Sequence, residues 1–434
     1  MGQVRIISAN QYGEEICACA ARISTTKGRA LELFDAATDR EKNRHLIGKV
    51  LASGHKSVLE HVVLSLAFCD VSAVVEEFMI EHRLASFTVK SRRYVDFSGL
   101  GFYIPPALAG ESRERYVGDM EALFGAYRAL LECGVPKEDA RFLLPYAFHS
   151  NFYCTLNARE LTHVLDDIRR GPWREVAELR ELGAELKEQL GELCPYLVPE
   201  FSRPAGEAGE SARRGESKPA ILPAEEAGRT ALLQGPAAAR AVTAAARELM
   251  GTAEAAACER ELEQLSYTFR ITGITLSGLT HLARHRIQSL LVSPLPRLVP
   301  ERFILPQTVA ENPEALTVYR AAVASACERY NAAAEDGALR PYSVYYLLSG
   351  ALTDVITTMN ARELKEFLRL RTCTRAQWEI RRIAVDMLML LRGELPELFG
   401  AFGPSCYSLG RCTEGRMSCG RAAEMQERFR PAER

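Results

Sequence analysis

The stretch Arg-His-Arg-Ile-Gln-Ser at residues 284–289 has an earlier partner in this 434-residue chain, Glu-His-Arg-Leu-Ala-Ser at residues 81–86. A second pair follows the first, Leu-Asn-Ala-Arg-Glu-Leu at 156–161 and Met-Asn-Ala-Arg-Glu-Leu at 359–364. The histidine and the asparagine of each half are 75 positions apart, 82 to 157 and 285 to 360. Two matches at one separation indicate a tandem duplication rather than chance.

The residues around both histidines predict the same local structure. Apolar and polar side chains alternate over residues 265–272, which is typical of a half-buried strand, and residues 275–284 then follow a helical pattern. In the first half, a strand-like run at 62–69 precedes a helix that contains Val74 and Met79. Each His-Arg pair is therefore expected where a helix ends and a turn begins.

Beyond these elements, both halves consist mainly of amphipathic helices. The clearest helical patterns lie at residues 113–132, 174–193 and 376–392. The predicted fold class is α+β, with two tandem copies of one domain in which helices pack on a small mixed or antiparallel sheet.

The chain is too long for one ordinary hydrophobic core, which favours two domains. Residues 203–240 are rich in Pro, Gly, Ala and Glu with few large apolar side chains, a composition that predicts a linker. We therefore expect a first domain at 1–202, a linker at 203–240, a degenerate second domain at 241–400 and a cysteine-containing tail at 401–434.

Charge and hydropathy narrow the class of partner. The formal net charge is −2, so no overall field attracts the chain to nucleic acid or to an anionic membrane. The first residues lack the apolar run and cleavage site of a secretion signal, and no later stretch is apolar over a membrane-spanning length. We expect a cytoplasmic protein whose partners are small molecules.

Most of the twelve cysteines are scattered among apolar surroundings, which indicates reduced thiols rather than a disulfide framework. Three of them, Cys406, Cys412 and Cys419, lie together in the glycine-rich stretch 403–421. With a fourth ligand from elsewhere they could hold zinc or an iron–sulfur cluster. Because the usual paired two-residue spacing is absent, the favoured interpretation is a loosely ordered, reduced tail.

The triplet Arg284-His285-Arg286 places two permanent cations and an imidazole at one helix end. Arginine forks match phosphate oxygens, so the triplet could grip a nucleotide or a diphosphate. A solvated basic helix terminus would be the simpler interpretation for a single triplet. Its recurrence in altered form at residues 81–83 favours a function.

Two other polar motifs lie in the first half. Residues 54–61, Gly-His-Lys-Ser-Val-Leu-Glu-His, could form a ligand pocket, or a helix start capped by Ser57 with Glu60 completing a capping box. Residues 91–94, Ser-Arg-Arg-Tyr, offer a hydroxyl, two guanidinium groups and a ring to a phosphorylated planar ligand. Arg141 could reach the same ligand, although a surface arginine beside a core segment is the simpler interpretation.

The sequence contains no nucleophile elbow, no Walker phosphate loop and no glycine fingerprint for a dinucleotide. If the chain is an enzyme, a bound cofactor is therefore expected to carry the difficult chemical step, while the protein supplies position and charge.

Taken in order, the motifs resemble those of flavin-dependent thymidylate synthases. The family signature is Arg-His-Arg, two residues, Ser, then Asn-Glu, one residue, Ser, one residue and Arg-Tyr. The resemblance implies reductive methylation of dUMP at C5, with methylenetetrahydrofolate as carbon donor, FAD as the hydride-carrying cofactor and NADPH as reductant. Because the family is typically tetrameric, it also implies a homodimer of this duplicated chain that forms a pseudo-tetramer.

The resemblance further implies roles for individual residues. The residues implied to bind FAD are Ser24, His55, Ser57, Glu60, His82, Arg83, Asn157, Arg159, Arg284, His285, Arg286, Asn360 and Arg362. The residues implied to bind the nucleotide are Ser91, Arg93, Arg141 and Arg371, of which Ser91, Arg93 and Arg371 are the candidate catalytic residues. No metal ion is assigned to either set.

Each half departs from the family pattern in its own way. In the first half, Glu81 replaces the leading arginine, residues 88–89 replace Asn-Glu, and the segment 168–175 lacks the Ala-Gln-Trp-Glu run. The second half keeps that run and the basic triplet, but prolines interrupt its nucleotide loop at 294–297. Val344 stands there in the place of Arg141, and a counterpart of residues 54–61 is not expected.

The retained residues are complementary, which predicts composite sites that combine the basic triplet of the second half with the groove of the first. Two alternatives remain open. One is a related flavoenzyme that modifies C5 of another pyrimidine nucleotide, and the other is a non-catalytic paralogue that binds flavin or nucleotide.

Overall fold

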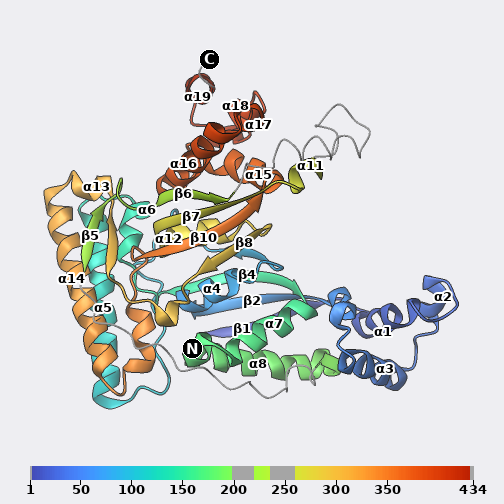
Figure 1. Cartoon of the computed structure of the whole chain (residues 1–434). Coiled ribbons are helices and arrows are strands. Elements are labelled where there is room, and N and C mark those ends of the chain that lie inside the picture. The colour runs from blue at the N-terminus through green and yellow to red at the C-terminus, as the bar shows by residue number, and fades with distance from the viewer. Residues whose placement is uncertain (1, 198–218, 235–259, 431–434) are drawn as a thin grey trace. The chain divides into compact units, whose positions relative to one another are not determined.

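The computed structural model describes residues 2–197, 219–234 and 260–430. The chain divides into two compact units (Figure 1). The first unit contains residues 1–217, 294–299 and 321–348, and the second contains residues 218–293, 300–320 and 349–434. Helix α14 (Pro313–Glu335) begins in the second unit and continues in the first.

The first unit is built on a four-stranded antiparallel sheet in the order β1-β2-β4-β3. Its strands are β1 (Gln3–Ala9), β2 (Val63–Ser72), β4 (His149–Asn157) and β3 (Ser86–Val89). Leu64, Leu66 and Phe68 alternate with more exposed residues along β2 and are buried. This period of two packs one face of the sheet into the core of the unit.

Helices surround this first sheet, and α7 and α8 lie along one of its faces (Figure 1). The α-helices are α1 (Gly13–Ile23), α2 (Ala30–Asp35), α3 (Arg40–Ala52), α4 (Ala73–Ile80), α5 (Gly110–Glu132), α6 (Lys137–Ala140), α7 (Ala158–Arg169) and α8 (Ala177–Leu193). Short 3-10 helices are η1 (Lys56–His61), η2 (Arg141–Leu143), η3 (Pro172–Glu175), η4 (Pro195–Leu197), η6 (Leu295–Arg297) and η7 (Arg340–Tyr346).

The second unit repeats this sheet in the order β6-β7-β10-β8. Its strands are β6 (Arg229–Gln234), β7 (Ser266–Thr275), β10 (Leu352–Asn360) and β8 (Gln288–Val292). All three pairings are antiparallel, as in the first sheet. A separate parallel pair joins β5 (Ala220–Pro223) to β9 (Arg302–Leu305).

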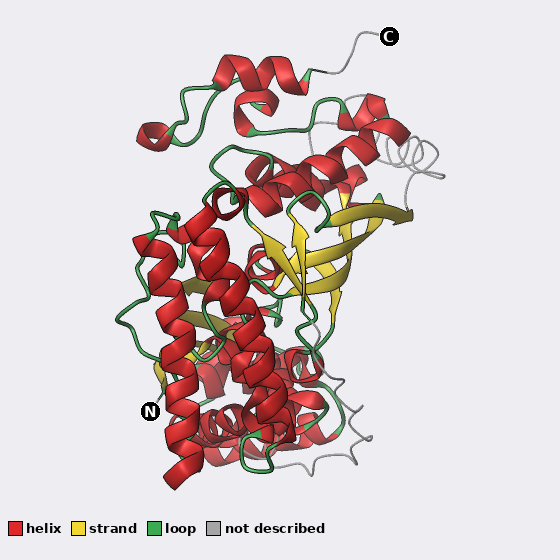
Figure 2. Ribbon diagram, turned by 90° about the vertical axis from the view of Figure 1, so that its left-hand side faces the viewer, coloured by secondary structure: helices red, strands yellow, loops and turns green. Residues whose placement is uncertain are grey.

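Helices also cover a face of the second sheet, whose twisted strands are seen in Figure 2. Helix α16 packs on β6 and β7, and its residues Ile380, Ile383 and Met387 are buried in the core of the unit. The helices of this unit are α11 (Arg260–Glu263), α12 (Leu276–Ala283), α13 (Gln307–Ala310), α15 (Ala361–Arg371), α16 (Trp378–Glu394), α17 (Pro396–Phe399), α18 (Ser405–Ser408), η8 (Gly415–Met417) and α19 (Ala422–Phe429).

In both units, the N-cap residue of the helix that precedes the His-Arg pair is hydrogen-bonded to a buried glutamate. Ser72 caps α4, and its backbone N–H donates to Glu178 Oε1 over 2.8 Å. Thr275 caps α12, and its backbone N–H donates to Glu379 Oε1 over 2.7 Å. Both glutamates are buried. The matching sheets and caps confirm the predicted duplication and the α+β class.

Glu379 is the last residue of Ala-Gln-Trp-Glu, so Glu178 takes its place in the first unit. The first half has therefore kept the glutamate, although the rest of the run is lost. Glu178 lies beyond residues 168–175, the segment in which the sequence analysis looked for the counterpart of Ala-Gln-Trp-Glu. The structure shows that Glu178 and Glu379 are equivalent, because each carboxylate accepts a hydrogen bond from the N-cap residue of the equivalent helix.

The position of Glu178 makes the stability of the chain pH-dependent. Burial raises its pKa from 4.5 to about 7, outweighing the hydrogen bonds from Ser72 and Tyr345 that favour the carboxylate. The folded chain thus holds this proton more tightly than the unfolded chain, so the stabilisation is present below pH 4.5 and is lost as the pH rises through 7. The difference is about 3 kcal/mol.

We expect Glu178→Gln to reduce the loss of thermal stability between pH 5 and pH 8, because the amide keeps an acceptor for Ser72 but carries no titrating proton. The measurement is the unfolding midpoint across that pH range. Glu188→Gln, at an exposed position of the same helix, is the control and should follow the wild-type curve. Parallel curves for Glu178→Gln and the wild type would contradict the assignment.

Part of the segment expected to be a linker forms strands. β6 pairs with β7, and β5 pairs with β9, so both strands find partners that lie far along the chain. Composition could not reveal this because the segment gains its order from those partners. In the second sheet β6 takes the place that β1 takes in the first. The domain boundaries themselves stay a prediction, and residues 203–218 and 235–240 lie outside the described residues.

The tail is not loosely ordered, and that expectation was wrong. Phe402, Cys406, Met425 and Phe429 are buried in the core of the second unit. The guanidinium of Arg392 donates to the carbonyl oxygens of residues 399, 400 and 402, which fixes the turn that begins the tail. A few well-spaced apolar side chains are enough to dock a glycine-rich segment onto an existing core.

Two further findings concern local structure. The capping box that was one of the two interpretations of residues 54–61 is absent: η1 begins at Lys56 and no side chain caps it. Within the described ranges, none of the helices combines the length and the apolar character that crossing a bilayer requires.

Candidate functional site

Ser91, Arg93 and Arg141 come together in the first unit, as their predicted shared ligand requires. Glu138 joins the two arginines: its Oε2 accepts from Arg93 Nε over 2.7 Å, and its carbonyl oxygen accepts from Arg141 Nε over 3.0 Å. The Ser91 hydroxyl accepts from the backbone N–H of Arg93 over 3.3 Å. A hydroxyl and two guanidinium groups are therefore held in one cluster.

The elements around this cluster explain how its side chains are placed. Ser91 and Arg93 follow the end of β3, and Arg141 stands at the junction of α6 and η2. Arg141 is only 2% exposed, so it is not the surface arginine that the simpler interpretation proposed. Glu138 was missed from the sequence, because only the fold shows that its α6 position faces both arginines.

The neighbouring Arg92 has a different role. It is buried and forms an ion pair of 2.7 Å with Glu76, and its guanidinium lies over the ring of Phe148. Glu76 also accepts from the hydroxyl of Ser150. Arg92 therefore anchors the loop in the core, while Arg93 belongs to the candidate cluster with Ser91 and Arg141.

The first-unit histidine, His82, is buried at the end of α4. Its Nδ1 lies 3.0 Å from the carbonyl oxygen of Phe78, and its Nε2 lies 3.3 Å from Asp167 Oδ2. At the preceding position, burial and the neighbouring carboxylates of Glu77 and Asp167 raise the pKa of Glu81 well above its usual range. The leading arginine has thus been replaced by a carboxyl group that favours its neutral form, next to the exposed Arg83.

The second-unit histidine, His285, lies between a carboxylate and a guanidinium group. Its Nδ1 lies 3.1 Å from Glu363 Oε1, and Arg371 Nε donates to its Nε2 over 3.0 Å. Because an arginine can only donate, Nε2 accepts and the ring proton lies on Nδ1, where it bonds to Glu363. Burial and the charge of Arg371 lower the pKa of His285, so the ring is neutral.

The structure thereby brings Arg371 next to His285 of the basic triplet, although the resemblance assigns Arg371 to the nucleotide and the triplet to FAD. Arg371 also donates to the carbonyl oxygen of His281 in α12, which fixes the end of α15 against that helix. Arg284 caps the C-terminus of α12 and, like Arg286, is exposed. The second unit thus presents two exposed guanidinium groups on either side of a buried neutral imidazole.

The paired asparagines are helix caps in both units. Asn157 Oδ1 accepts from the backbone N–H of Glu160 over 2.9 Å, and Asn360 Oδ1 accepts from that of Glu363 over 2.8 Å. Each fixes the first turn of its helix, α7 or α15. In the second unit this cap positions Glu363, which holds His285. Glu363 was also missed from the sequence.

The arginines that follow these caps are paired in the same way in both units. Arg159 forms an ion pair with Glu60, and Arg362 forms one with Glu263 in α11. The partners are separated by 99 positions in each case. Glu263 is therefore a counterpart of Glu60, so the expectation that the second half has no counterpart of residues 54–61 was wrong at this position. The signal available was the shared Leu-Glu dipeptide at 59–60 and 262–263.

Three of the residues implied to bind flavin stand apart from these clusters. Ser24 is the exposed C-cap of α1, and His55 and Ser57 are exposed at the start of η1. Among the residues that the structure describes, no hydrogen bond or ion pair joins their side chains to the other candidates. Their roles stay predictions.

The sequence matches the family described as thymidylate synthase complementing protein over residues 5–196 and again over residues 224–397. The chain belongs to this family, that of the flavin-dependent thymidylate synthases. Both copies of the domain are therefore members of an enzyme family, and the second match begins just before β6. This confirms the resemblance that the motifs carried.

Flavin-dependent thymidylate synthases from several organisms are similar to the chain. That of Geobacter sulfurreducens is 40% identical over 174 residues, which cover 39% of this chain and 74% of the relative. That of Nitratidesulfovibrio vulgaris is 36% identical over 186 residues, which cover 40% of this chain and 73% of the relative. Each alignment spans less than half of this chain, as expected when one domain has been duplicated.

Two solved structures can also be superposed on part of the chain. The UMP/dUMP methylase PolB from Streptomyces cacaoi, bound with 5-Br dUMP, has a TM-score of 0.39 and 24% identity, covering 46% of this chain and 95% of that chain. Thymidylate synthase X from Helicobacter pylori, with FAD and dUMP, has a TM-score of 0.38 and 19% identity, covering 47% and 100%.

Proposed function

We propose that this member of the flavin-dependent thymidylate synthase family catalyses FAD-dependent reductive methylation of dUMP to dTMP, with methylenetetrahydrofolate as carbon donor and NADPH as reductant. The observation that carries the proposal is the cluster of Ser91, Arg93 and Arg141 around Glu138. Two guanidinium groups and a hydroxyl are well suited to a nucleotide phosphate, because charge-assisted hydrogen bonds to phosphate are strong and directional.

The second unit supplies groups suited to flavin. Arg284 and Arg286 would bind the phosphates of FAD. Arg371, which the resemblance assigns to the nucleotide, would place a further cation beside them, oriented by its hydrogen bond to the neutral His285. Bound FAD in its reduced form would supply the hydride. The protein's contribution is then to place cations and to keep His285 in one tautomer through Glu363.

We further propose that turnover needs the retained residues of both copies, because neither copy has the complete family set. In solution the chain would be a homodimer, which brings four copies of the domain into one assembly. Light scattering on the purified protein should give twice the mass of the chain. A monomer that turns over normally would contradict the dimer.

The direct test is tritium release from dUMP labelled at C5, with methylenetetrahydrofolate and NADPH present. We expect release that depends on both co-substrates and on bound FAD. Arg93→Ala should weaken nucleotide binding by about 100-fold, since a hydrogen bond to a charged group contributes up to about 3 kcal/mol. Arg113→Ala, at an exposed position in α5, is the matched control and should bind normally.

The outcomes separate the alternatives. Methyl transfer to UMP but not to dUMP would favour the related flavoenzyme, a reading that the replacement of Asn-Glu by Thr88 and Val89 keeps open. Tight flavin binding with no tritium release would favour the non-catalytic paralogue. Wild-type nucleotide affinity in both Arg93→Ala and Arg141→Ala would show that the cluster is not the nucleotide site.

A further inference from the structure

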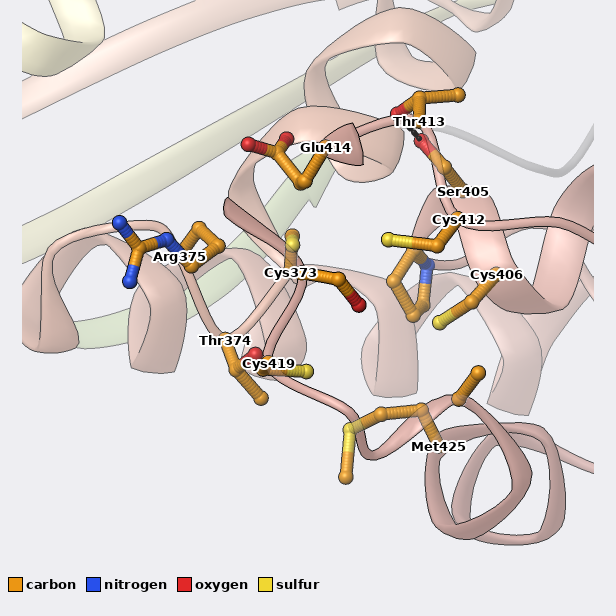
Figure 3. A pocket seen from close by; sticks show the side chains of 13 residues that line it. Cys373, Thr374, Arg375, Ser405, Cys406, Cys412, Thr413, Glu414, Cys419 and Met425 are labelled. Carbon is orange, nitrogen blue, oxygen red and sulfur yellow. Dashed lines mark hydrogen bonds between the residues drawn. The ribbon is translucent and has the colours of Figure 1, made fainter. Parts of the chain in front are cut away.

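Four cysteines from three separate segments of the second unit line one cavity of about 20 Å³ (Figure 3). Cys373 lies in the loop between α15 and α16, Cys406 lies in α18, and Cys412 and Cys419 lie in the loops before and after η8. All four are free thiols. Cys406 is buried, Cys373 is half-buried, and the other two are exposed at the mouth of the cavity.

The fold holds these segments in place without the help of disulfides. The hydroxyl of Thr413, next to Cys412, donates to Ser405 Oγ over 3.1 Å. Gln426 in α19 donates to the carbonyl oxygen of Cys406 over 3.0 Å. Together with the buried Met425, these contacts keep the loops of the tail around the cavity.

The four cysteines are the soft ligands in the lining of this cavity (Figure 3). Apart from Arg375 and Glu414, the other lining residues are small, apolar or hydroxyl-bearing. Thiolate sulfur is the donor that zinc and iron–sulfur clusters select.

A set of four cysteines is suited either to one zinc ion or to an iron–sulfur cluster. A zinc ion needs all four sulfurs at about 2.3 Å from one point, and its ligands usually come in pairs two to four residues apart. Here positions 406, 412 and 419 are six and seven apart, and position 373 is distant. In residues 2–197, 219–234 and 260–430, no three candidate ligands converge closely enough for a single ion.

A cluster of iron and sulfide is wider than one ion and is held by thiolates at its corners, so it tolerates this spread. We propose that Cys373, Cys406, Cys412 and Cys419 bind a [4Fe–4S] cluster as thiolates, each thiol losing its proton on binding. The cluster would join the tail to the loop that follows Arg371, the residue that holds His285. The lining of this cavity includes none of the residues implied to bind flavin or nucleotide.

The test is metal and sulfide analysis of the full chain purified without exposure to oxygen. We expect about four iron and four acid-labile sulfide per chain, as a [4Fe–4S] cluster requires, and no stoichiometric zinc. Cys412→Ser and Cys419→Ser should each lose most of the iron. Cys69→Ser, at a half-buried thiol in β2 of the first unit, is the matched control and should keep it.

Each outcome decides the proposal independently of turnover. Because Cys412 and Cys419 are exposed, their serine variants should fold, which far-ultraviolet circular dichroism checks. Should a variant fail to fold, the stoichiometry of the wild-type protein still decides. One equivalent of zinc without iron, no metal in the anaerobic wild-type protein, or full iron in both serine variants would each overturn the cluster.

Discussion

Replacing Arg92 by alanine is expected to destabilise the chain by about 3–5 kcal/mol, the cost of leaving one partner of a buried ion pair without the other. The Arg92 and Glu76 side chains are 5% and 2% exposed and lie 2.7 Å apart. The variant would leave the Glu76 carboxylate in the core with only Ser150 as its remaining described donor. The measurement is the free energy of unfolding by chemical denaturation.

Arg93→Ala is the matched control, because it removes the same side chain one position further along. Its partner Glu138 is 24% exposed, so water can take over the lost contact. We expect a loss of at most about 1 kcal/mol, as for partly exposed ion pairs. If the two variants were equally destabilised, the proposal that Arg92 anchors the loop while Arg93 serves the ligand would be contradicted.

The different roles of the adjacent Arg92 and Arg93 could not be predicted from the sequence. The motif Ser-Arg-Arg-Tyr marked the loop correctly, and Arg93 was chosen over Arg92 by the resemblance alone. What separates them physically is burial against Glu76 and Phe148, residues that lie 16 and 56 positions away. Short-range patterns cannot report such contacts.

Periodic patterns were sufficient for the elements that carry both histidines. Strands β2 and β7 and helices α4 and α12 lie where the sequence patterns placed them. Each strand alternates between buried and more exposed residues, and the two apolar helices are almost wholly buried in their own units. By contrast, β6 depends on pairing with β7, and the tail depends on docking to an existing core. Neither β6 nor the tail has a local sequence pattern strong enough to predict its structure.

The same reason explains the residues that were missed. Glu138, Glu363 and Cys373 are single side chains in unremarkable surroundings, and each gains its meaning from a partner on another element. The cysteines at 406, 412 and 419 were noted because they are near one another in sequence. Cys373, 33 positions earlier, joins them only through the packing of α15, α18 and α19.

The duplication has left the two histidines with different sets of partners. Each contacts a carboxylate, that of Asp167 for His82 and that of Glu363 for His285, and His285 also accepts a hydrogen bond from Arg371. At the position equivalent to Arg371 the first unit has Ile168, which is buried. The first unit therefore lacks the arginine that donates to His285, and under the proposed function the second unit would be the one that holds flavin.

Arg371→Ala is therefore expected to lower kcat/KM for tritium release by about 100-fold, which corresponds to about 3 kcal/mol for losing a charged hydrogen-bonding group. Burial and the Arg371 charge together lower the pKa of His285, so removing the charge should raise that pKa. His285 would then become protonated at higher pH, and the acid limb of the pH–rate profile should move to higher pH. A merely structural role for Arg371 would not shift this limb.

The control for this prediction is Arg369→Ala on the same helix, which removes a half-buried guanidinium paired with Glu366 and Ser405 and not with His285. It should leave both kcat/KM and the pH profile close to those of the wild type. Arg371→Lys keeps the charge but not the planar fork, so it should retain the wild-type acid limb while losing part of the rate. If Arg371→Ala and Arg371→Lys have the same pH profile as the wild type, Arg371 does not influence the protonation of His285, and the assignment of His285 as the neutral imidazole that orients Arg371 fails with it.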